Sequence, residues 1–241
     1  MFSERVRVLR NRAIEDGIFV LTLESDHISE AMPGQFVTLS FGGDDPLIPR
    51  PLSVFDAGEG KAVFLVKIRG KATKLLSELR EGDVIFATGP LGKPLPELHD
   101  PVLVAGGVGV APLAFYARRY EARLLLGLPE RNPGLLDLLS DVRPEVIYEN
   151  TPDGGTVVEL VKKRFSSEAL YIACGPWAMT KALLEVIPAE RVVVLAEGMM
   201  ACGVGTCLVC AIPAISGGYL RVCTDGPWFR ATEIDFTRAF G

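Results

Sequence analysis

Four cysteines near the C-terminus have the residue type and spacing that most clearly indicate chemistry. They are Cys202, Cys207, Cys210 and Cys223, in the pattern Cys-x4-Cys-x2-Cys-x12-Cys. This is the plant-type arrangement that holds a 2Fe–2S cluster. Gly203 and Gly205 would let the first loop adopt positive φ and turn its N–H groups toward a negative cluster. The spacing therefore predicts a 2Fe–2S centre, which carries one electron at a time.

Two other uses of clustered cysteines remain open from the spacing alone. Zinc sites usually show two Cys-x2-Cys pairs, whereas this chain has one, and disulfides are typical of secreted proteins. Both uses are therefore less favoured than the cluster. The fifth cysteine, Cys174, lies in a separate apolar stretch, where a small buried side chain is the ordinary interpretation.

The composition indicates a globular protein with no affinity for polyanions. The chain has 241 residues, 49% of them hydrophobic, which is enough for one large or two medium domains. The net charge is −5 and the basic residues are scattered, so nucleic acid is not an expected partner. Met1 to Arg12 is charged and does not resemble a signal peptide. The longest apolar run, Val102 to Ala117, contains glycines and proline and is shorter than the roughly 20 residues of a membrane span. We expect a cytoplasmic protein with no membrane association.

The elements that must position the cysteines begin with short alternating runs separated by turn residues. This texture predicts a small antiparallel β-barrel over residues 1–97. One helix is expected within it, at Lys71 to Leu79. The predicted strands are Val6 to Leu9, Ile18 to Leu23, Gln35 to Phe41, Ala62 to Ile68 and Val84 to Thr88.

Residues 98–196 have a different texture, with continuous apolar runs joined by helical stretches. Such runs predict a parallel sheet buried on both faces in an α/β domain. The predicted strands are Val102 to Ala105, Arg123 to Leu126, Val146 to Tyr148, Leu170 to Ala173 and Val192 to Leu195. The predicted helices are Leu113 to Tyr120, Gly155 to Phe165 and Ala178 to Val186. The tail, residues 197–241, lacks this pattern and is expected to be organised around its cysteines.

Two short motifs in the first domain could bind a phosphate-bearing cofactor. In Arg50-Pro51-Leu52-Ser53 the guanidinium could make a bidentate contact with phosphate, and the Ser53 hydroxyl could bond a ring nitrogen. In Gly70-Lys71-Ala72-Thr73 the residues Ala72 and Thr73 would lie at a helix N-terminus, where anions are favoured. The alternatives are a surface arginine in a turn and simple N-capping by Thr73.

Two turns in the second domain could receive a dinucleotide. The run Val102 to Pro112 is typical of a strand, a glycine turn with Gly106, Gly107 and Gly109, and a helix start. Glycines let the backbone approach a pyrophosphate, although any glycine turn can be structural. Cys174-Gly175-Pro176 ends another buried strand, which places it at the carboxyl edge of the same sheet, where ligands bind in open α/β folds.

In order and spacing these motifs, together with Gly89-Pro90-Leu91-Gly92, resemble those of the ferredoxin-NADP reductase superfamily over essentially the whole chain. Within it, the tail from Glu197 to Phe229 is similar to that of the electron-transfer subunits of NAD-dependent dihydroorotate dehydrogenase B. A sister group, the small subunits of NADH-dependent ferredoxin:NADP reductases, tends to carry aspartate where this chain has Cys202. The four-cysteine set therefore favours the dihydroorotate family.

The resemblance implies FAD in the barrel, NAD(H) as co-substrate in the α/β domain and a 2Fe–2S cluster in the tail. It implies that the flavin and its phosphates contact the residues Arg50, Pro51, Leu52, Ser53, Leu65, Val66, Lys67, Ala72 and Thr73. The nicotinamide nucleotide would lie at Gly106, Gly107, Gly109, Cys174, Gly175 and Pro176. After the strand at Arg123 to Leu126, Glu130 would favour NADH and Arg131 would tolerate NADPH. We expect NADH.

The resemblance also implies a partner. No catalytic acid or base for an organic metabolite is predicted, since His27 and His99 lie in polar, loop-like stretches. A chain without such a site is expected to exchange electrons with another polypeptide. By resemblance this is the FMN-containing catalytic subunit, in a heterotetramer of two catalytic and two electron-transfer subunits with the cluster near the interface. Electrons from orotate formation in pyrimidine synthesis would pass from FMN through the cluster and FAD to NAD.

Two other functions remain open. The first is an NAD(P)H-dependent flavin reductase subunit that serves ferredoxin, a hydrogenase or a sulfur-reducing system. The second is a redox sensor whose cluster state controls binding to a partner, and it leaves the flavin motifs unexplained.

Overall fold

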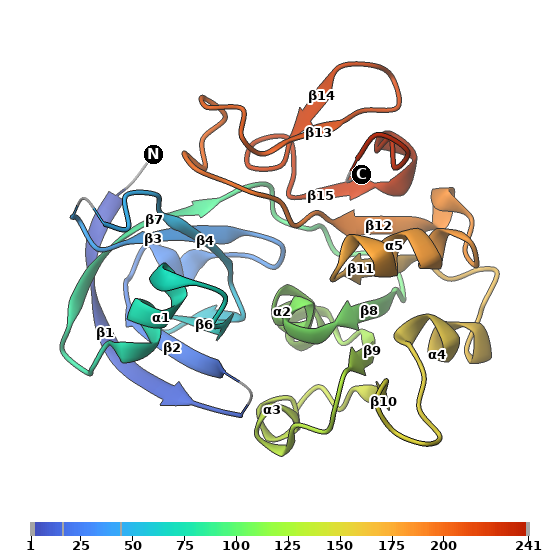
Figure 1. The fold of residues 1–241 in the computed structure, drawn as a ribbon, viewed down its shortest axis with the longest axis horizontal. Coiled ribbons are helices and arrows are strands. Elements are labelled where there is room, and N and C mark those ends of the chain that lie inside the picture. The colour runs from blue at the N-terminus through green and yellow to red at the C-terminus, as the bar shows by residue number, and fades with distance from the viewer. Residues whose placement is uncertain (1–2, 16, 44, 240–241) are drawn as a thin grey trace.

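The first half of the chain forms an antiparallel sheet that curls into a half-barrel (Figure 1). The computed structural model describes residues 3–15, 17–43 and 45–239. The strand order is β4-β3-β7-β1-β2-β6-β5. The strands are β1 (Ser3–Ala13), β2 (Ile18–Glu24), β3 (Phe36–Ser40), β4 (Arg50–Ser53), β5 (Asp56–Gly58), β6 (Lys61–Lys67) and β7 (Val84–Leu91).

This sheet confirms the predicted antiparallel strands and adds two short ones. Strand β4 begins at Arg50 and pairs with β3, so the Arg50–Ser53 motif lies on a sheet edge. Strand β5 has three residues, too few for a periodic pattern to register. The single predicted helix is α1 (Lys71–Glu78).

The second half forms a mixed sheet of six strands in the order β10-β9-β8-β11-β12-β15. The five predicted strands are parallel, as expected. They are β8 (Val102–Gly106), β9 (Arg123–Leu128), β10 (Glu145–Tyr148), β11 (Tyr171–Cys174) and β12 (Val192–Leu195). The helices are α2 (Val110–Tyr120), α3 (Pro133–Leu138), α4 (Val157–Lys163) and α5 (Trp177–Leu184). Short 3-10 turns span Ile28–Glu30, Gly107–Gly109, Ala189–Arg191 and Ala231–Glu233.

Helix α3 is absent from the prediction, although its start has a recognisable signal. The Asn132 side chain accepts a hydrogen bond from the Leu135 N–H at 2.8 Å, and Pro133 follows as the first helical residue. Asn at the N-cap with Pro after it is a common helix start. The helix has only six residues, so its apolar periodicity is too short to stand out.

The C-terminal tail contains strands that the sequence pattern does not indicate. A two-stranded sheet joins β13 (Ala211–Pro213) to β14 (Tyr219–Arg221), and β15 (Trp228–Arg230) joins the large sheet antiparallel to β12. Each of these strands has three residues, which is too short to show alternation. The tail is thus built onto the α/β domain as well as around its cysteines.

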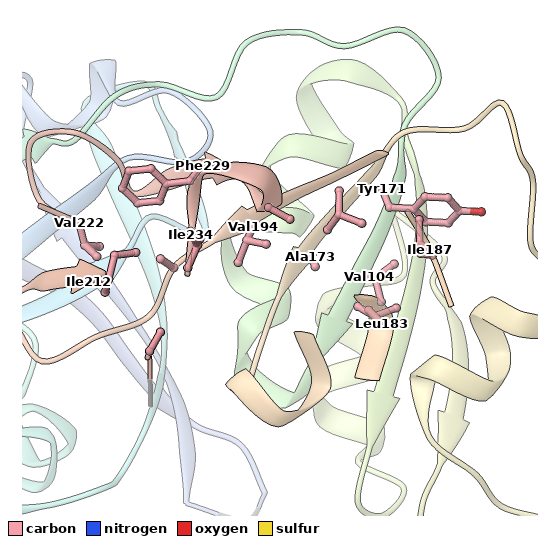
Figure 2. Close-up of a cluster of buried hydrophobic side chains, with 14 of the residues drawn as sticks. Val104, Tyr171, Ala173, Leu183, Ile187, Val194, Ile212, Val222, Phe229 and Ile234 are labelled. Carbon is pink, nitrogen blue, oxygen red and sulfur yellow. The ribbon is translucent and has the colours of Figure 1, made fainter. Parts of the chain in front are cut away.

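Buried side chains join the tail to the sheet. Ile212, Val222 and Phe229 from the tail belong to one apolar cluster with Val104 of β8 and Val194 of β12 (Figure 2). Cys210 and Cys223 belong to the same cluster and are 3% and 1% exposed. Two of the four predicted ligands are therefore anchored in the core of the α/β domain.

The half-barrel packs directly on the α/β domain. Strand β2 is buried on both faces: Phe19 and Leu21 pack inside the half-barrel, while Ile18 and Val20 pack in a core shared with β8 and α2. Across this contact Arg118 of α2 donates a hydrogen bond to the Phe55 carbonyl at 3.1 Å. A shared core of this kind fixes the two domains against each other.

Over residues 3–15, 17–43 and 45–239, none of the helices has both the length and the apolar character needed to cross a membrane.

Candidate functional site

The four cysteines gather at one place, where a tight loop faces the segment after β14. Within the loop, Gly203 has φ 71° and Gly205 has φ 81°, as predicted from their sequence. The loop amides point at sulfur: the N–H groups of Val204 and Cys207 donate to Cys202 Sγ, both at 3.4 Å. The Gly205 N–H donates to Cys223 Sγ at 3.1 Å. Amides aimed at sulfur stabilise negative charge there, as an iron-sulfur site requires.

The thiols lie in unequal electrostatic surroundings. The hydrogen bond from the Val204 amide, with that from Cys207, lowers the pKa of Cys202 to about 6. Burial and the nearby Cys210 thiol raise the pKa of Cys223 to about 11. The Sγ atoms of Cys210 and Cys223 are 3.2 Å apart, and all the cysteines are free thiols. The disulfide alternative therefore has no support.

A two-iron cluster and a single zinc ion would use the four thiols differently. Among the residues that the structure describes, no three His, Cys, Asp or Glu side chains stand close enough together to hold one metal ion. A zinc site needs four ligands around one ion, whereas each iron of a 2Fe–2S cluster takes only two of the four thiolates. The thiolate donor set and the loop amides fit this cluster.

The cysteine loop is seated on the half-barrel. A Cβ placed on Gly203 would lie 3.1 Å from both Leu91 Cδ1 of β7 and Thr38 Cγ2 of β3. Further along, Trp228 Nε1 donates to the Pro94 carbonyl at 3.0 Å, and the Lys93 N–H donates to the Gly226 carbonyl at 2.7 Å. These contacts hold the segments before and after Cys223 against the first domain.

A cavity of about 510 Å³ lies between the half-barrel and the α/β domain, and we call it the barrel cavity. It is where most of the predicted flavin contacts meet. Its lining includes Pro51, Leu52, Ser53, Leu65, Val66, Lys67 and Thr73. Arg50 and Ala72 are outside this lining.

Arg50, although outside this lining, has a feature that a bound ligand would explain. Its Nε is buried and has no hydrogen-bond partner among the described residues. A buried donor without a partner is costly, so a ligand oxygen would explain it. The residues around the barrel cavity therefore fit a phosphate-bearing cofactor such as FAD.

The start of α1 partly follows the capping alternative. Thr73 Oγ1 accepts hydrogen bonds from the N–H groups of Arg69 at 2.8 Å and Gly70 at 3.1 Å. Its hydroxyl is thus used to shape the turn. Ala72 is buried, so only its backbone is available to a ligand. What this turn can give an anion is its backbone N–H groups.

A second cavity of about 690 Å³ opens at the carboxyl edge of the parallel strands, and we call it the sheet-edge cavity. Gly106, Gly107, Gly109 and Pro176 line it, together with Glu130. Of the other predicted residues, Cys174 is buried at 2% exposure and Gly175 does not line the cavity. Arg131 does not line it either.

The glycines of this turn serve two different purposes. A Cβ on Gly109 would lie 2.4 Å from the Cys174 carbonyl oxygen, and one on Gly106 would lie 2.8 Å from Met179 Sδ. These two glycines let the turns after β8 and β11 pack together. Gly107 has φ 55° and open space around its Cβ position. Gly107 is therefore the residue where a ligand can approach the backbone.

Glu197 is a site residue that the sequence analysis missed. It lines both cavities, and its Oε1 lies 3.7 Å from Cys174 Sγ. The surrounding cavity walls raise the pKa of Glu197, and burial raises the pKa of Cys174 well above its usual value. Glu197 begins the tail that carries the family resemblance, but the resemblance assigned it no role, and its position just after β12 brings it between the cavities.

The two cavities share a wall, and the barrel cavity extends to residues next to the cysteines in the chain. Lys67, Arg69, Val108, Pro176 and Glu197 line both cavities. The barrel cavity is also lined by Met200, just before Cys202, and by Val222, just before Cys223. A group in the barrel cavity would therefore lie between the sheet-edge cavity and the cysteines.

Comparison with protein families matches the half-barrel and the C-terminal tail. Residues 8–94 match the oxidoreductase FAD-binding domain, which covers the half-barrel. Residues 197–235 match the iron-sulfur cluster binding domain of dihydroorotate dehydrogenase B, which covers all four cysteines.

Solved structures share the fold. One described as an NADH-dependent reduced ferredoxin-NADP oxidoreductase, studied for flavin-based electron bifurcation, superposes with a TM-score of 0.82 at 28% identity, over 97% of this chain and 91% of that chain. Ferredoxin-NADP⁺ reductase from Plasmodium falciparum superposes with a TM-score of 0.66 at 13% identity, over 80% and 95% of the two chains. The second likeness shows the fold alone.

Relatives of similar length carry one shared description. The chain is 35% identical to the dihydroorotate dehydrogenase B (NAD(+)) electron transfer subunit of Caldanaerobacter subterraneus subsp. tengcongensis, over 96% of this chain and 98% of the relative. It is 34% identical to the subunit of the same description from Bacillus caldolyticus, with the same coverage. With the cysteine loop, the two cavities and both family matches in agreement, the chain belongs to the family of electron transfer subunits of dihydroorotate dehydrogenase B.

Proposed function

We propose that this chain links a dihydroorotate-oxidising subunit to NAD in pyrimidine synthesis. The observation that carries the proposal is that the two cavities share a wall and that Met200 and Val222, close to the cysteines in the chain, line the barrel cavity. When bound, FAD exchanges a hydride with NAD(H) and single electrons with a 2Fe–2S cluster. The residues of the chain must then hold these groups in sequence and keep water from the path between them.

FAD is assigned to the barrel cavity. Arg50 would hold a phosphate through its guanidinium, whose buried Nε has no partner among the described residues, and the α1 start would add backbone N–H groups at Ala72 and Thr73. Ser53 and the edge of β6 at Leu65, Val66 and Lys67 would orient the ring system. The apolar walls contributed by Leu52 and Val222 exclude water from the ring.

NAD(H) is assigned to the sheet-edge cavity. The open backbone at Gly107 is the place for the nucleotide phosphates, and Glu130 in the cavity wall supports NADH over NADPH because a 2′-phosphate would meet a carboxylate. Gly106, Gly109, Cys174 and Gly175 would act by fixing the turns, and Pro176 by lining the cavity.

We also propose three functional units, which are residues 1–97 for FAD, 98–196 for NAD(H) and 197–241 for the cluster. The two family matches support the first and last of these. Strand β15 ties the third unit to the sheet of the second, so we expect these two to fold together.

The partner would be an FMN-containing catalytic subunit in a heterotetramer of two subunits of each kind. Large apolar side chains are exposed on the tail that carries the cysteines, where a partner would cover them: Met199, Leu208, Val209, Ile215 and Tyr219. Patches of exposed apolar side chains typically mark interaction sites.

The cytoplasmic location stays a prediction that cell fractionation would test.

A second candidate is a flavin reductase subunit that serves ferredoxin. The TM-score of 0.82 to the NADH-dependent reduced ferredoxin-NADP oxidoreductase structure favours it. This candidate predicts NADH oxidation with ferredoxin as acceptor and no association with a dihydroorotate-oxidising subunit.

Purification of the native complex tests the assignment. We expect the chain to copurify with an FMN-containing subunit, and the complex to reduce NAD with dihydroorotate. Copurification with a ferredoxin-dependent or hydrogenase subunit, with no dihydroorotate activity, would support the second candidate instead.

Two cysteine-to-serine variants of the same complex test whether the cysteines bind the cluster. Cys207→Ser should abolish the iron signal and electron transfer to the partner, while FAD stays bound because the barrel cavity does not include Cys207. Cys174→Ser is the matched control. Cys174 is a free cysteine outside the cysteine loop, so this substitution should leave the iron content unchanged. Iron retained in Cys207→Ser would refute the ligand assignment.

A further inference from the structure

One hydroxyl beside the cysteines has no partner. Thr224 Oγ1 is buried, and no hydrogen bond to it is formed by the described residues. A buried hydroxyl without a partner is unfavourable, so such groups are rare in native proteins and call for an explanation. Thr224 directly follows Cys223 in the chain.

The side chain of Thr224 packs against Gly205 of the cysteine loop. A Cβ placed on Gly205 would lie 2.9 Å from Thr224 Cγ2 and 3.2 Å from Thr224 Oγ1. The same glycine donates its N–H to Cys223 Sγ at 3.1 Å. The Thr224 hydroxyl is therefore held between the cysteine loop and the segment that carries Cys223.

The polar groups of Arg221 and Asp225, which are close to Thr224 in sequence, form hydrogen bonds with each other and with the backbone. The Asp225 carboxylate accepts hydrogen bonds from the Arg221 N–H at 2.8 Å, from Arg221 Nε at 3.1 Å and from Arg221 Nη2 at 3.0 Å. The Arg221 carbonyl accepts the N–H of Thr224 at 3.2 Å and that of Asp225 at 2.8 Å. This network fixes the turn and does not include the Thr224 hydroxyl, which is left without a partner among the described residues.

We propose that the Thr224 hydroxyl donates a hydrogen bond to a sulfur atom of the 2Fe–2S cluster and raises its reduction potential. One-electron reduction adds a negative charge to the cluster, and a hydrogen-bond donor at sulfur stabilises that charge. The proposal rests on the assigned function, because it needs the cluster to be present. It makes Thr224 a positioning and tuning residue, not a ligand.

Three substitutions of Thr224 test this proposal in the full chain, purified without oxygen. Thr224→Val keeps the shape but removes the hydroxyl, Thr224→Ala removes the hydroxyl and the bulk, and Thr224→Ser keeps the hydroxyl. A redox titration followed by electron paramagnetic resonance gives the cluster potential. Pulsed measurements in H₂O and D₂O report whether an exchangeable proton is coupled to the cluster.

We expect the potential to fall in Thr224→Val and Thr224→Ala, and to stay at the wild-type value in Thr224→Ser. One exchangeable-proton coupling should disappear in the first two variants and persist in the third. If Thr224→Val does not assemble a cluster, Thr224→Ala decides. An unchanged potential and coupling in a cluster-loaded variant without the hydroxyl would overturn the proposal. Wild-type protein without iron would instead overturn the assigned function, so the two failures are distinguishable.

Discussion

The glycine turn after β8 and the cysteine loop before Cys210 are both rich in glycine, but their glycines have different structural roles. Gly106 and Gly109 are needed because the turn after β11 packs against them, within one domain. Gly203 and Gly205 have positive φ and pack against the half-barrel and Thr224, so they join separate parts of the chain. The first turn is therefore part of the core of a domain, whereas the loop depends on how the domains are assembled.

Exchanging glycine for alanine in the first turn should give the largest effect. In Gly109→Ala the new Cβ would meet the Cys174 carbonyl oxygen at 2.4 Å, which forces the backbone to move. We expect a loss of about 3 kcal/mol in the free energy of unfolding, as for other overpacked cores. Urea unfolding followed by circular dichroism measures it.

Gly107→Ala is the matched control in the same turn. Its Cβ meets nothing within 4 Å, so only the positive φ of 55° is unfavourable, at about 1 kcal/mol. We expect a folded protein with weaker NADH binding. Equal destabilisation by the two substitutions would show that packing against β11 is not what the glycine at 109 provides.

The same contrast explains what the sequence could and could not predict. The cysteine spacing is local, so the four ligands were predicted together, and the structure brings them to one place. The continuous apolar runs gave the five parallel strands for the same reason. The purpose of Gly106 and Gly109 is not local, because Met179 and Cys174 lie more than 60 residues away along the chain. A pattern cannot distinguish a glycine that admits a ligand from one that admits another turn.

The path between the cavities and the cysteines was also beyond local patterns. Glu197 and Met200 line the barrel cavity because they follow β12, whereas Val222 lines it where the chain returns to β12 through β15, a strand of three residues. So short a strand leaves no periodic signal. The unpartnered nitrogen of Arg50 is likewise visible only when its surroundings are known.

A glycine-to-alanine substitution in the cysteine loop tests the other half of the comparison, the contact of this loop with the half-barrel. Gly203→Ala introduces a Cβ 3.1 Å from Leu91 and Thr38 at a residue with φ 71°. We expect a loss of about 1–2 kcal/mol from the backbone conformation, with slower NADH-driven reduction of the cluster because the loop is displaced from the half-barrel. Unfolding and stopped-flow absorbance measure the two effects.

Gly217→Ala is the matched control for this loop. Gly217 has φ 89° in the connection between β13 and β14, and a Cβ there meets nothing within 4 Å. It should lose comparable stability yet reduce its cluster at the wild-type rate. If both variants reduce the cluster equally fast, the contact of Gly203 with the half-barrel does not position the cysteines.

The smallest effect is expected where charge, not packing, holds the α/β domain. At the sheet edge, Glu145 of β10 accepts hydrogen bonds from Arg164 at 2.8 Å and Arg123 at 3.0 Å, and these hold the pKa of Glu145 below its usual value. A carboxylate whose pKa is lower in the folded state stabilises the fold above its unfolded pKa of about 4.3. That contribution is lost as the pH falls through the folded pKa. Glu145→Gln should therefore cost no more than ~1 kcal/mol at pH 7, the range of exposed ion pairs.

The pH dependence separates this ion pair from a packing effect. The difference in unfolding free energy between wild type and Glu145→Gln should be constant from pH 6 to 8 and shrink as the pH falls below about 4, because protonated Glu145 resembles glutamine in charge. Glu168→Gln is the control, since its pair with Arg191 is 3.9 Å long and 88% exposed at Glu168, so it should change little at any pH. A difference that persists at low pH would mean that Glu145 stabilises the fold by packing and not by its charge. The sheet edge would then depend on packing, as the glycine turn after β8 does.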